Sequence, residues 1–232
     1  MKTEALWNDV VLHQPDGQFS LGTDAVACAH FARFPKGSNI ADLGCGSGAI
    51  ALMLLANDAS CQVTGIELEH TAAEAAKLNS QGLSFSVLEA DLRQIRTLLP
   101  PGCMDCVISN PPYFPVGSGQ TAKGVLARAR SEETCTLAQL TDAAAWLLPT
   151  GGRFVLVHRP ERLADLVWEL RRVMLEPKRI RFVRHSAKND VSLVLLEARK
   201  GGKPGLQYEP DLILYNEDGI PTREYLQMYH KE

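Results

Sequence analysis

The 232-residue sequence contains no run of apolar residues long enough to cross a membrane. A spanning helix needs about 20 predominantly apolar residues, and charged residues interrupt every stretch of that length. Residues 1–11 also lack the apolar segment behind a basic head that marks a secretory signal. We therefore expect no membrane partner and a cytoplasmic location.

A second pair of closely spaced cysteines is missing as well. The chain has 6 cysteines, and Cys103 and Cys106 form its single C-x-x-C arrangement. A structural zinc site normally needs two such pairs, and Cys106 opens a predicted strand. The cysteines are therefore interpreted as small buried apolar residues in a reducing compartment, and we expect no metal.

The net charge is only −3, but the charges are unevenly distributed along the chain. Residues 151–203 hold 13 lysines and arginines against 6 acids, whereas residues 204–232 hold 2 against 6. The basic residues of the first segment include Arg171, Arg172, Lys178, Arg179, Arg181, Arg184 and Lys188. Such a stretch could form a phosphate-binding face, or it could be a solvated helix and turn.

Short apolar runs alternate with segments of helical periodicity, which predicts a parallel sheet covered by helices on both faces. The predicted strands are 39–43, 62–67, 84–89, 105–109, 153–158, 180–185 and 191–199, and the predicted helices are 24–34, 48–57, 71–81, 137–148 and 161–174. The last two strands are joined by a short turn, so they should pair antiparallel. We expect a doubly wound α/β fold with a seven-stranded sheet, in which six strands are parallel and the strand at the end is antiparallel.

The length favours one compact unit rather than two complete domains. We divide it into an N-terminal segment, residues 1–38, with the motif F-S-L-G-T-D-A; an α/β domain, residues 39–200; and a tail, residues 201–232, that packs on the same domain. Residues 114–134 are polar and glycine-rich with weak periodicity, which is typical of a functional loop.

A glycine-rich turn leads from the first predicted strand directly into a helix. Its sequence is Asp42-Leu43-Gly44-Cys45-Gly46-Ser47-Gly48. The three glycines let the backbone approach a ligand closely. The spacing differs from the G-x-G-x-x-G of dinucleotide-binding folds, and the carboxylate of Asp42 suits an ammonium group better than a phosphate.

Two further acids follow the next two strands. Glu67 ends the second strand, where a carboxylate can accept the hydroxyl groups of a ribose, and Asp91 follows the third strand, where it can meet an adenine amine. Each has an ordinary alternative, a solvated strand end for Glu67 and a helix cap for Asp91. The glycine turn and the two acids in series resemble the class I S-adenosylmethionine-dependent methyltransferase family, over roughly residues 19–200.

This resemblance implies a Rossmann-like fold and S-adenosyl-L-methionine as the cofactor. The residues that it places against the cofactor in this part of the chain are Asp42, Gly44, Gly46, Gly48, Glu67, Leu68, Asp91 and Leu92.

The motif Asn110-Pro111-Pro112-Tyr113 follows the fourth predicted strand. The amide oxygen of Asn110 and the carbonyl of Pro111 can accept both hydrogens of one NH2 group, and Tyr113 can stack on the ring that carries it. This arrangement would direct the nitrogen lone pair at a methyl group in an in-line displacement, without a strong base. The alternative is a strand ended by proline with a surface tyrosine.

The tetrad Asn110, Pro111, Pro112 and Tyr113 resembles that of N6-adenine methyltransferases, which implies that Asn110 also lies against the cofactor. It is also similar to the tetrads of rRNA guanine-N2 enzymes and of enzymes that methylate N5 of glutamine in release factors. The latter carry a preceding helical domain, for which the first 38 residues are too few. A DNA adenine-N6 enzyme is disfavoured because no segment resembles a domain that reads bases in the major groove. A non-enzymatic RNA-binding module is disfavoured by the intact motifs.

The N-terminal motif Phe19-Ser20-Leu21-Gly22-Thr23-Asp24 resembles the tRNA adenine-N6 methyltransferase subfamily that modifies adenosine 37, beside the anticodon of a valine tRNA. The resemblance implies that Phe19, Thr23 and Asp24 line the methionine end of the cofactor, although Thr23 or Asp24 could instead cap a helix. It implies tRNA as the partner. Arg128, Arg130, Arg181 and Arg184 would then contact its phosphates.

Residues 151–163 and the acidic tail also resemble this subfamily. One position departs from its pattern, because Ser131 follows Arg130 where a histidine is expected.

Overall fold

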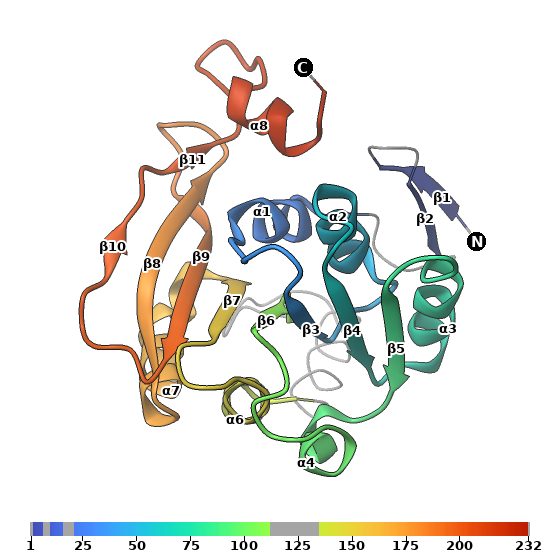
Figure 1. Ribbon diagram of the computed structural model, residues 1–232. Helices are drawn as coiled ribbons and strands as arrows, with labels where there is room; N and C mark the ends of the chain where they lie inside the picture. Colours follow the sequence, from blue (N-terminus) through green and yellow to red (C-terminus); the bar gives the residue numbers. More distant parts are fainter. Residues whose placement is uncertain (1, 7–9, 16–20, 112–134, 232) are drawn as a thin grey trace, which may run out of the picture.

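The computed structural model describes residues 2–6, 10–15, 21–111 and 135–231. Within these ranges a central nine-stranded sheet has the order β10-β8-β9-β7-β6-β3-β4-β5, with β11 beside β8 (Figure 1). Its strands are β3 (Asn39–Leu43), β4 (Gln62–Glu67), β5 (Phe85–Glu89), β6 (Cys106–Ser109), β7 (Arg153–His158), β8 (Leu175–Arg184), β9 (Val191–Lys200), β10 (Gln207–Tyr208) and β11 (Leu212–Ile213). The loop predicted at 114–134 lies outside the described residues.

The sequence-based topology is confirmed for seven of these strands. β3, β4, β5, β6 and β7 pair in parallel, and β9 pairs antiparallel with both β7 and β8. The reversed strand is therefore the last of the seven in sequence, but it lies between β7 and β8 in space. The predicted start of β8 is too late, because Pro177 interrupts the residue pattern that is typical of a strand. This proline lies next to a register shift between β8 and β9.

Four short strands were not predicted. β10 and β11 are two residues each and extend the sheet along β8, so the sheet has nine strands instead of seven. β1 (Lys2–Ala5) and β2 (Val11–Gln14) form a separate antiparallel pair. Asn79 fastens β2 to the main domain, since it accepts from the backbone N–H of His13 and donates to the carbonyl of the same residue, each at 2.8 Å.

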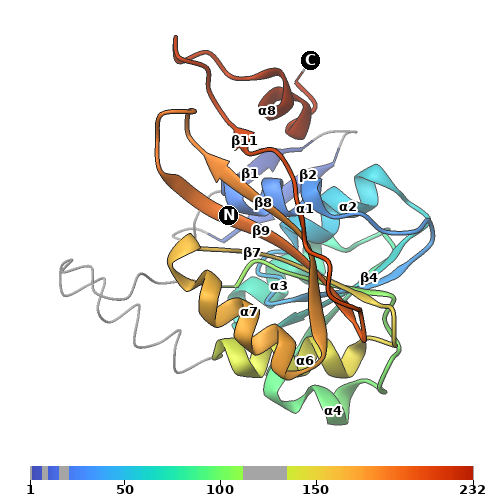
Figure 2. The ribbon, with the colours of Figure 1, turned by 90° about the vertical axis from the view of Figure 1, so that its left-hand side faces the viewer.

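Helices cover both faces of the sheet, as predicted (Figures 1 and 2). One face is covered by α1 (Thr23–Phe31), α2 (Ala49–Asn57) and α3 (His70–Asn79), and the other by α4 (Ile95–Leu98), α6 (Leu137–Leu147) and α7 (Leu163–Arg172). Short 3-10 helices, η1 (Leu92–Gln94) and η2 (Pro160–Arg162), and the C-terminal α8 (Arg223–Met228) complete the described elements. No helix in the described ranges is long and apolar enough to cross a membrane.

Each face has its own apolar core. Val26, Met53 and Leu54 of α1 and α2 pack on Ile108 and Val155 of the sheet. On the other face, the core consists of residues from α6, α7 and the strands, among them Leu140, Leu147, Phe154, Leu166 and Leu196. All six cysteines are free, and four of them are buried, as expected for small apolar residues.

Acidic residues of the tail form ion pairs with three arginines of β8. Arg179 bonds to Glu209 at 2.8 Å, Arg181 to Glu224 at 2.6 and 2.7 Å, and Arg184 to Asp211 at 2.6 Å. Leu212, Leu214 and Met228 of the same tail are buried in the core beside α1. The uneven charge along the sequence therefore corresponds, in large part, to contacts between the tail and β8.

Replacing Arg179 by methionine is expected to destabilise the fold by about 3 kcal/mol, because it leaves the buried Glu197 without its close cationic partner. The free energy of unfolding in urea measures this loss. Adding Glu197→Gln should recover much of the stability, since it removes the uncompensated charge. Equal stability of the Arg179→Met variant and the parent would contradict a stabilising role for this ion pair.

Candidate active site

The candidate site lies at the edge of the sheet where the parallel strands end. Since β3, β4, β5 and β6 run in the same direction, their carboxyl ends meet there. The residues at or just beyond these ends are Gly44, Glu67, Asp91 and Asn110. Ligands of open α/β sheets bind at this edge, and the structure places these four residues, all predicted to bind the cofactor, along it.

The glycine turn after β3 leaves open space beside two of its glycines. Gly44, Gly46 and Gly48 have φ of 72°, 56° and 85°, in the left-handed region. A Cβ at Gly44 or Gly46 would meet no atom of the described residues within 4 Å, whereas one at Gly48 would lie 2.6 Å from the ring of Phe85. The first two glycines therefore border a space for a ligand, while the third is also required by packing.

Glu67 is fixed against this turn. One carboxylate oxygen accepts from the backbone N–H of Gly46 and the other from that of Glu69, each at 2.8 Å. The backbone N–H groups of Gly44 and Cys45 donate to the carbonyl of Ile66 at 2.8 and 3.2 Å. These bonds hold the end of β4 and the turn after β3 in a fixed relation.

Asp42 is buried without a partner. Its side chain is 1% exposed, and neither carboxylate oxygen has a hydrogen-bond partner among the described residues. Burial, with a further contribution from Glu67, raises the pKa of Asp42 to about 8. Buried polar groups are normally hydrogen-bonded, so this carboxyl group is suited to a cationic donor from a ligand.

Asn110, which directly follows the neighbouring strand β6, resembles Asp42 in this respect. Its side-chain oxygen is buried and has no hydrogen-bond partner within the described ranges. β3 and β6 pair directly, with Asp42 opposite Ile108. Two such acceptors, a carboxyl group within the end of β3 and an amide just beyond β6, therefore lie at the ends of adjacent strands. Pro111 is described, but Pro112 and Tyr113 lie outside the described residues, as do Phe19, Arg128 and Arg130.

Asp91 takes the helix-cap role that the sequence left open. It accepts from the backbone N–H of Arg93 at 2.9 Å and from its Nε at 2.7 Å. The hydrogen bond from Arg93 lowers the pKa of Asp91. Leu68 is exposed beside Glu67, and Leu92 packs partly against α6, so both apolar side chains flank the ends of β4 and β5.

Neither Thr23 nor Asp24 is the N-cap of α1, the alternative role considered from the sequence. Gly22 is the N-cap residue and makes no side-chain cap. The Thr23 hydroxyl lies 3.4 Å from the hydroxyl of Tyr229, in the C-terminal tail. Asp24 accepts from the backbone N–H of Ala25 at 2.9 Å.

Two arginines expected to bind phosphate have carboxylate partners in the structure. Arg181 and Arg184 are held by Glu224 and Asp211 of the tail. In the structure these ion pairs connect the tail to β8. We therefore assign no phosphate contact to Arg181 and Arg184.

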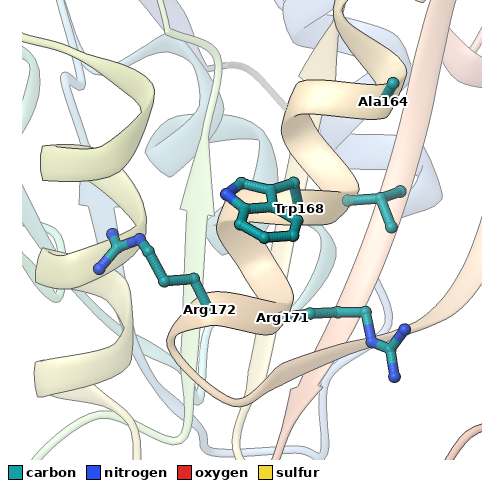
Figure 3. Close-up of a pocket in the computed structure, with 5 residues that line it drawn as sticks. Ala164, Trp168, Arg171 and Arg172 are labelled. Atoms are coloured by element: carbon teal, nitrogen blue, oxygen red, sulfur yellow. The ribbon is translucent and has the colours of Figure 1, made fainter.

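An open hollow lies on the outer surface of α7 (Figure 3). Its lining residues are Ala164, Val167, Trp168, Arg171 and Arg172. Arg171 pairs with Glu176, and Arg172 pairs with Glu169 and Asp142. Because these carboxylates neutralise both guanidinium groups, we assign the hollow to neither cofactor nor phosphate.

The sequence motifs did not indicate three residues next to the candidate ones, two at strand ends and one in the tail. Ser109 and His158 end β6 and β7, and Tyr229 reaches α1 from the tail. Burial lowers the pKa of His158, whose Nδ1 accepts from the N–H of Arg159 at 2.8 Å. Position at a strand end could have indicated Ser109 and His158, but no local signal predicts the contact of Tyr229.

The chain is similar to known methyltransferases. It matches the methyltransferase small domain family over residues 10–174. It is 30% identical over 193 residues to the tRNA1(Val) (adenine(37)-N6)-methyltransferase of Photobacterium profundum, with 80% of each chain covered. The protein of that name from Porphyromonas gingivalis is 30% identical over 220 residues, which cover 90% of this chain and 86% of the relative.

A solved structure shows the same fold. It is that of a predicted O-methyltransferase from Agrobacterium tumefaciens, with a TM-score of 0.73 at 22% identity, over 90% of this chain and 96% of that one. The fold class and the family expected from the sequence are thus confirmed. The chain belongs to the methyltransferase small domain family and to the family of the tRNA1(Val) (adenine(37)-N6)-methyltransferases.

Proposed function

We propose that this protein is a cytoplasmic enzyme that transfers the methyl group of S-adenosyl-L-methionine to N6 of an adenosine in tRNA. The observation that carries the proposal is the pair of buried acceptors, Asp42 and Asn110, at adjacent strand ends, for which the described part of the chain offers no hydrogen-bond partner. The relatives' names supply the substrate, adenosine 37 of a valine tRNA. Asp42 lies within β3 and Asn110 directly follows β6, and these two strands pair with each other, which suits a mechanism that depends on positioning.

The cofactor fits the residues at the ends of β3 and β4. S-adenosyl-L-methionine supplies a methyl group on a sulfonium centre, together with an ammonium, a ribose and an adenine. Asp42 would bind the ammonium, and the space beside Gly44 and Gly46 would receive the extended ligand. Glu67 would accept ribose hydroxyl groups, while Asp91, Leu68 and Leu92 would contact the adenine.

The target amine would be held by the end of β6. The oxygens of Asn110 and Pro111 accept hydrogen bonds from its two N–H groups, so that the nitrogen lone pair is directed at the methyl group. After transfer, the nitrogen is cationic and releases a proton to water. The target adenine has to leave its stack to reach this position. We further assign stacking to Tyr113, contacts at the methionine end of the cofactor to Phe19, Thr23 and Asp24, and phosphate contacts to Arg128 and Arg130.

The direct test is incubation with methyl-labelled S-adenosyl-L-methionine and unmodified tRNA, followed by nucleoside analysis. Parallel reactions contain rRNA, DNA or a release-factor protein. We expect N6-methyladenosine in tRNA alone, and a valine tRNA with adenosine 37 replaced by guanosine should remain unlabelled. Label in rRNA guanosine, in DNA or in glutamine would overturn the substrate assignment, and cofactor that fails to bind would overturn the activity.

A further inference from the structure

The end of β6 is joined to the end of β3 by a side chain that no part of the proposed chemistry uses. Ser109, the last residue of β6, is fully buried, and its hydroxyl donates to the carbonyl of Leu43 at 2.7 Å. We propose that Ser109 is a positioning residue, which sets the spacing between the cofactor-binding turn and Asn110. This inference rests on the proposed function, since it concerns the distance between methyl donor and target amine.

The hydroxyl bond lies where the main-chain pairing of the two strands stops. The register of β3 and β6 runs from Ile40 opposite Cys106 to Asp42 opposite Ile108. Leu43 and Ser109 are the next residues on the two strands, and the side-chain bond connects them. It therefore extends the connection by one residue, directly before Gly44 on one strand and Asn110 on the other.

The backbone carbonyl of Ser109 makes a second contact, with helix α1. The thiol of Cys28, on α1, lies 3.7 Å from the carbonyl oxygen of Ser109, to which it donates. Both residues are fully buried. α1 begins at Thr23, so this contact links Ser109 to the element that we place at the methionine end of the cofactor. The peptide before Asn110 is thus held by a strand on one side and a helix on the other.

The chemical step makes this spacing important. Reacting atoms have to be held about 3 to 3.5 Å apart, and a shift of about 1 Å can reduce the rate by about 100-fold. Removing the Ser109 hydroxyl would leave the carbonyl of Leu43 without this donor and release the end of β6 from β3. The contacts of Glu67 with Gly46 and Glu69 do not involve Ser109. Cofactor binding should therefore be affected much less than turnover.

The chain offers a closely matched control in Ser38. Its hydroxyl also donates to a backbone carbonyl at 2.7 Å, that of Pro35, and Ser38 is only 3% exposed. Ser38 stands just before β3, at the opposite edge of the sheet from the candidate site. Ser38→Ala and Ser109→Ala remove the same group from similar surroundings, so their difference reports on position.

The experiment compares the parent, Ser109→Ala, Ser109→Thr and Ser38→Ala in kcat, in KM for tRNA and in calorimetric Kd for the cofactor, below the melting temperature of each. For Ser109→Ala we expect kcat to fall by about 10- to 100-fold, with little change in cofactor Kd. Ser109→Thr, which keeps a hydroxyl, should recover part of kcat. Ser38→Ala should retain the parent kcat even if its thermal stability falls.

Three results would overturn the inference: an unchanged kcat in Ser109→Ala, an equal loss of kcat in Ser38→Ala, or a cofactor Kd that weakens in parallel with kcat. The activity of the parent protein on tRNA distinguishes a failure of this inference from a failure of the proposed function. A parent that forms no N6-methyladenosine in tRNA would overturn the proposed function. An active parent with an equally active Ser109→Ala variant would overturn the role of Ser109 alone.

Discussion

Replacing Asn110 by alanine is expected to reduce methyl transfer severely while leaving cofactor affinity nearly unchanged. The variant loses the buried amide oxygen that has no hydrogen-bond partner among the described residues and that we assign to the target amine. Loss of one such aligned polar group from an active site typically reduces turnover by about 100- to 1000-fold. Single-turnover rates with saturating tRNA and cofactor measure the effect, and calorimetry with the cofactor alone measures binding.

Asn110→Asp is the matched variant for this prediction, because it keeps an acceptor oxygen at the same position and replaces the amide NH2 by a second, ionisable oxygen. It should retain more activity than Asn110→Ala. If Asn110→Ala lost cofactor affinity as steeply as turnover, the residue would belong to the cofactor pocket and the proposed target position would be wrong.

The sequence predicted the central sheet well because the information is local. Each of β3, β4 and β7 is a short apolar run with a turn at its end, and the bounds of these strands agree with the prediction. β10 and β11 could not be predicted in this way. They are two residues long and form only because buried residues such as Leu212 and ion pairs such as Arg184–Asp211 hold the tail against β8.

The same distinction separates the site residues that motifs revealed from those that they missed. Asp42 and Asn110 stand in or beside motifs of glycine or proline, whose backbone requirements are visible in a single segment. The role of Ser109 depends on a carbonyl 66 positions earlier in the chain. Arg181 and Arg184 suggested a phosphate face because their acidic partners lie far along the sequence, in the tail.

Replacing Asp42 by asparagine is expected to remove most of the cofactor affinity and, at the same time, to stabilise the ligand-free protein. The variant cannot pair with the cofactor's ammonium group, and loss of a buried charge pair costs about 2–5 kcal/mol, which weakens binding by at least about 30-fold. Titration calorimetry measures this loss. Asp105→Asn, which changes an exposed acid before β6, is the control and should bind like the parent.

The stability effect follows from the pKa of Asp42, which burial raises from 3.8 to about 8. Between these values the unfolded chain has released the proton while the ligand-free folded protein still holds it, so the stability contribution of Asp42 falls as pH rises from about 4 to about 8. Asparagine does not titrate. The stability advantage of Asp42→Asn should therefore grow with pH across this window and level off above it.

The same titration makes cofactor binding dependent on pH. Below about pH 8 the carboxyl group of Asp42 has to release its proton before it can pair with an ammonium, so affinity for the parent should rise as pH increases from 6 towards 8. Binding at pH 7 should release a proton, seen as a binding heat that varies with the ionisation enthalpy of the buffer, and Asp42→Asn should lose this dependence. A buffer-independent heat in the parent would mean that Asp42 releases no proton on binding, which would contradict this linkage.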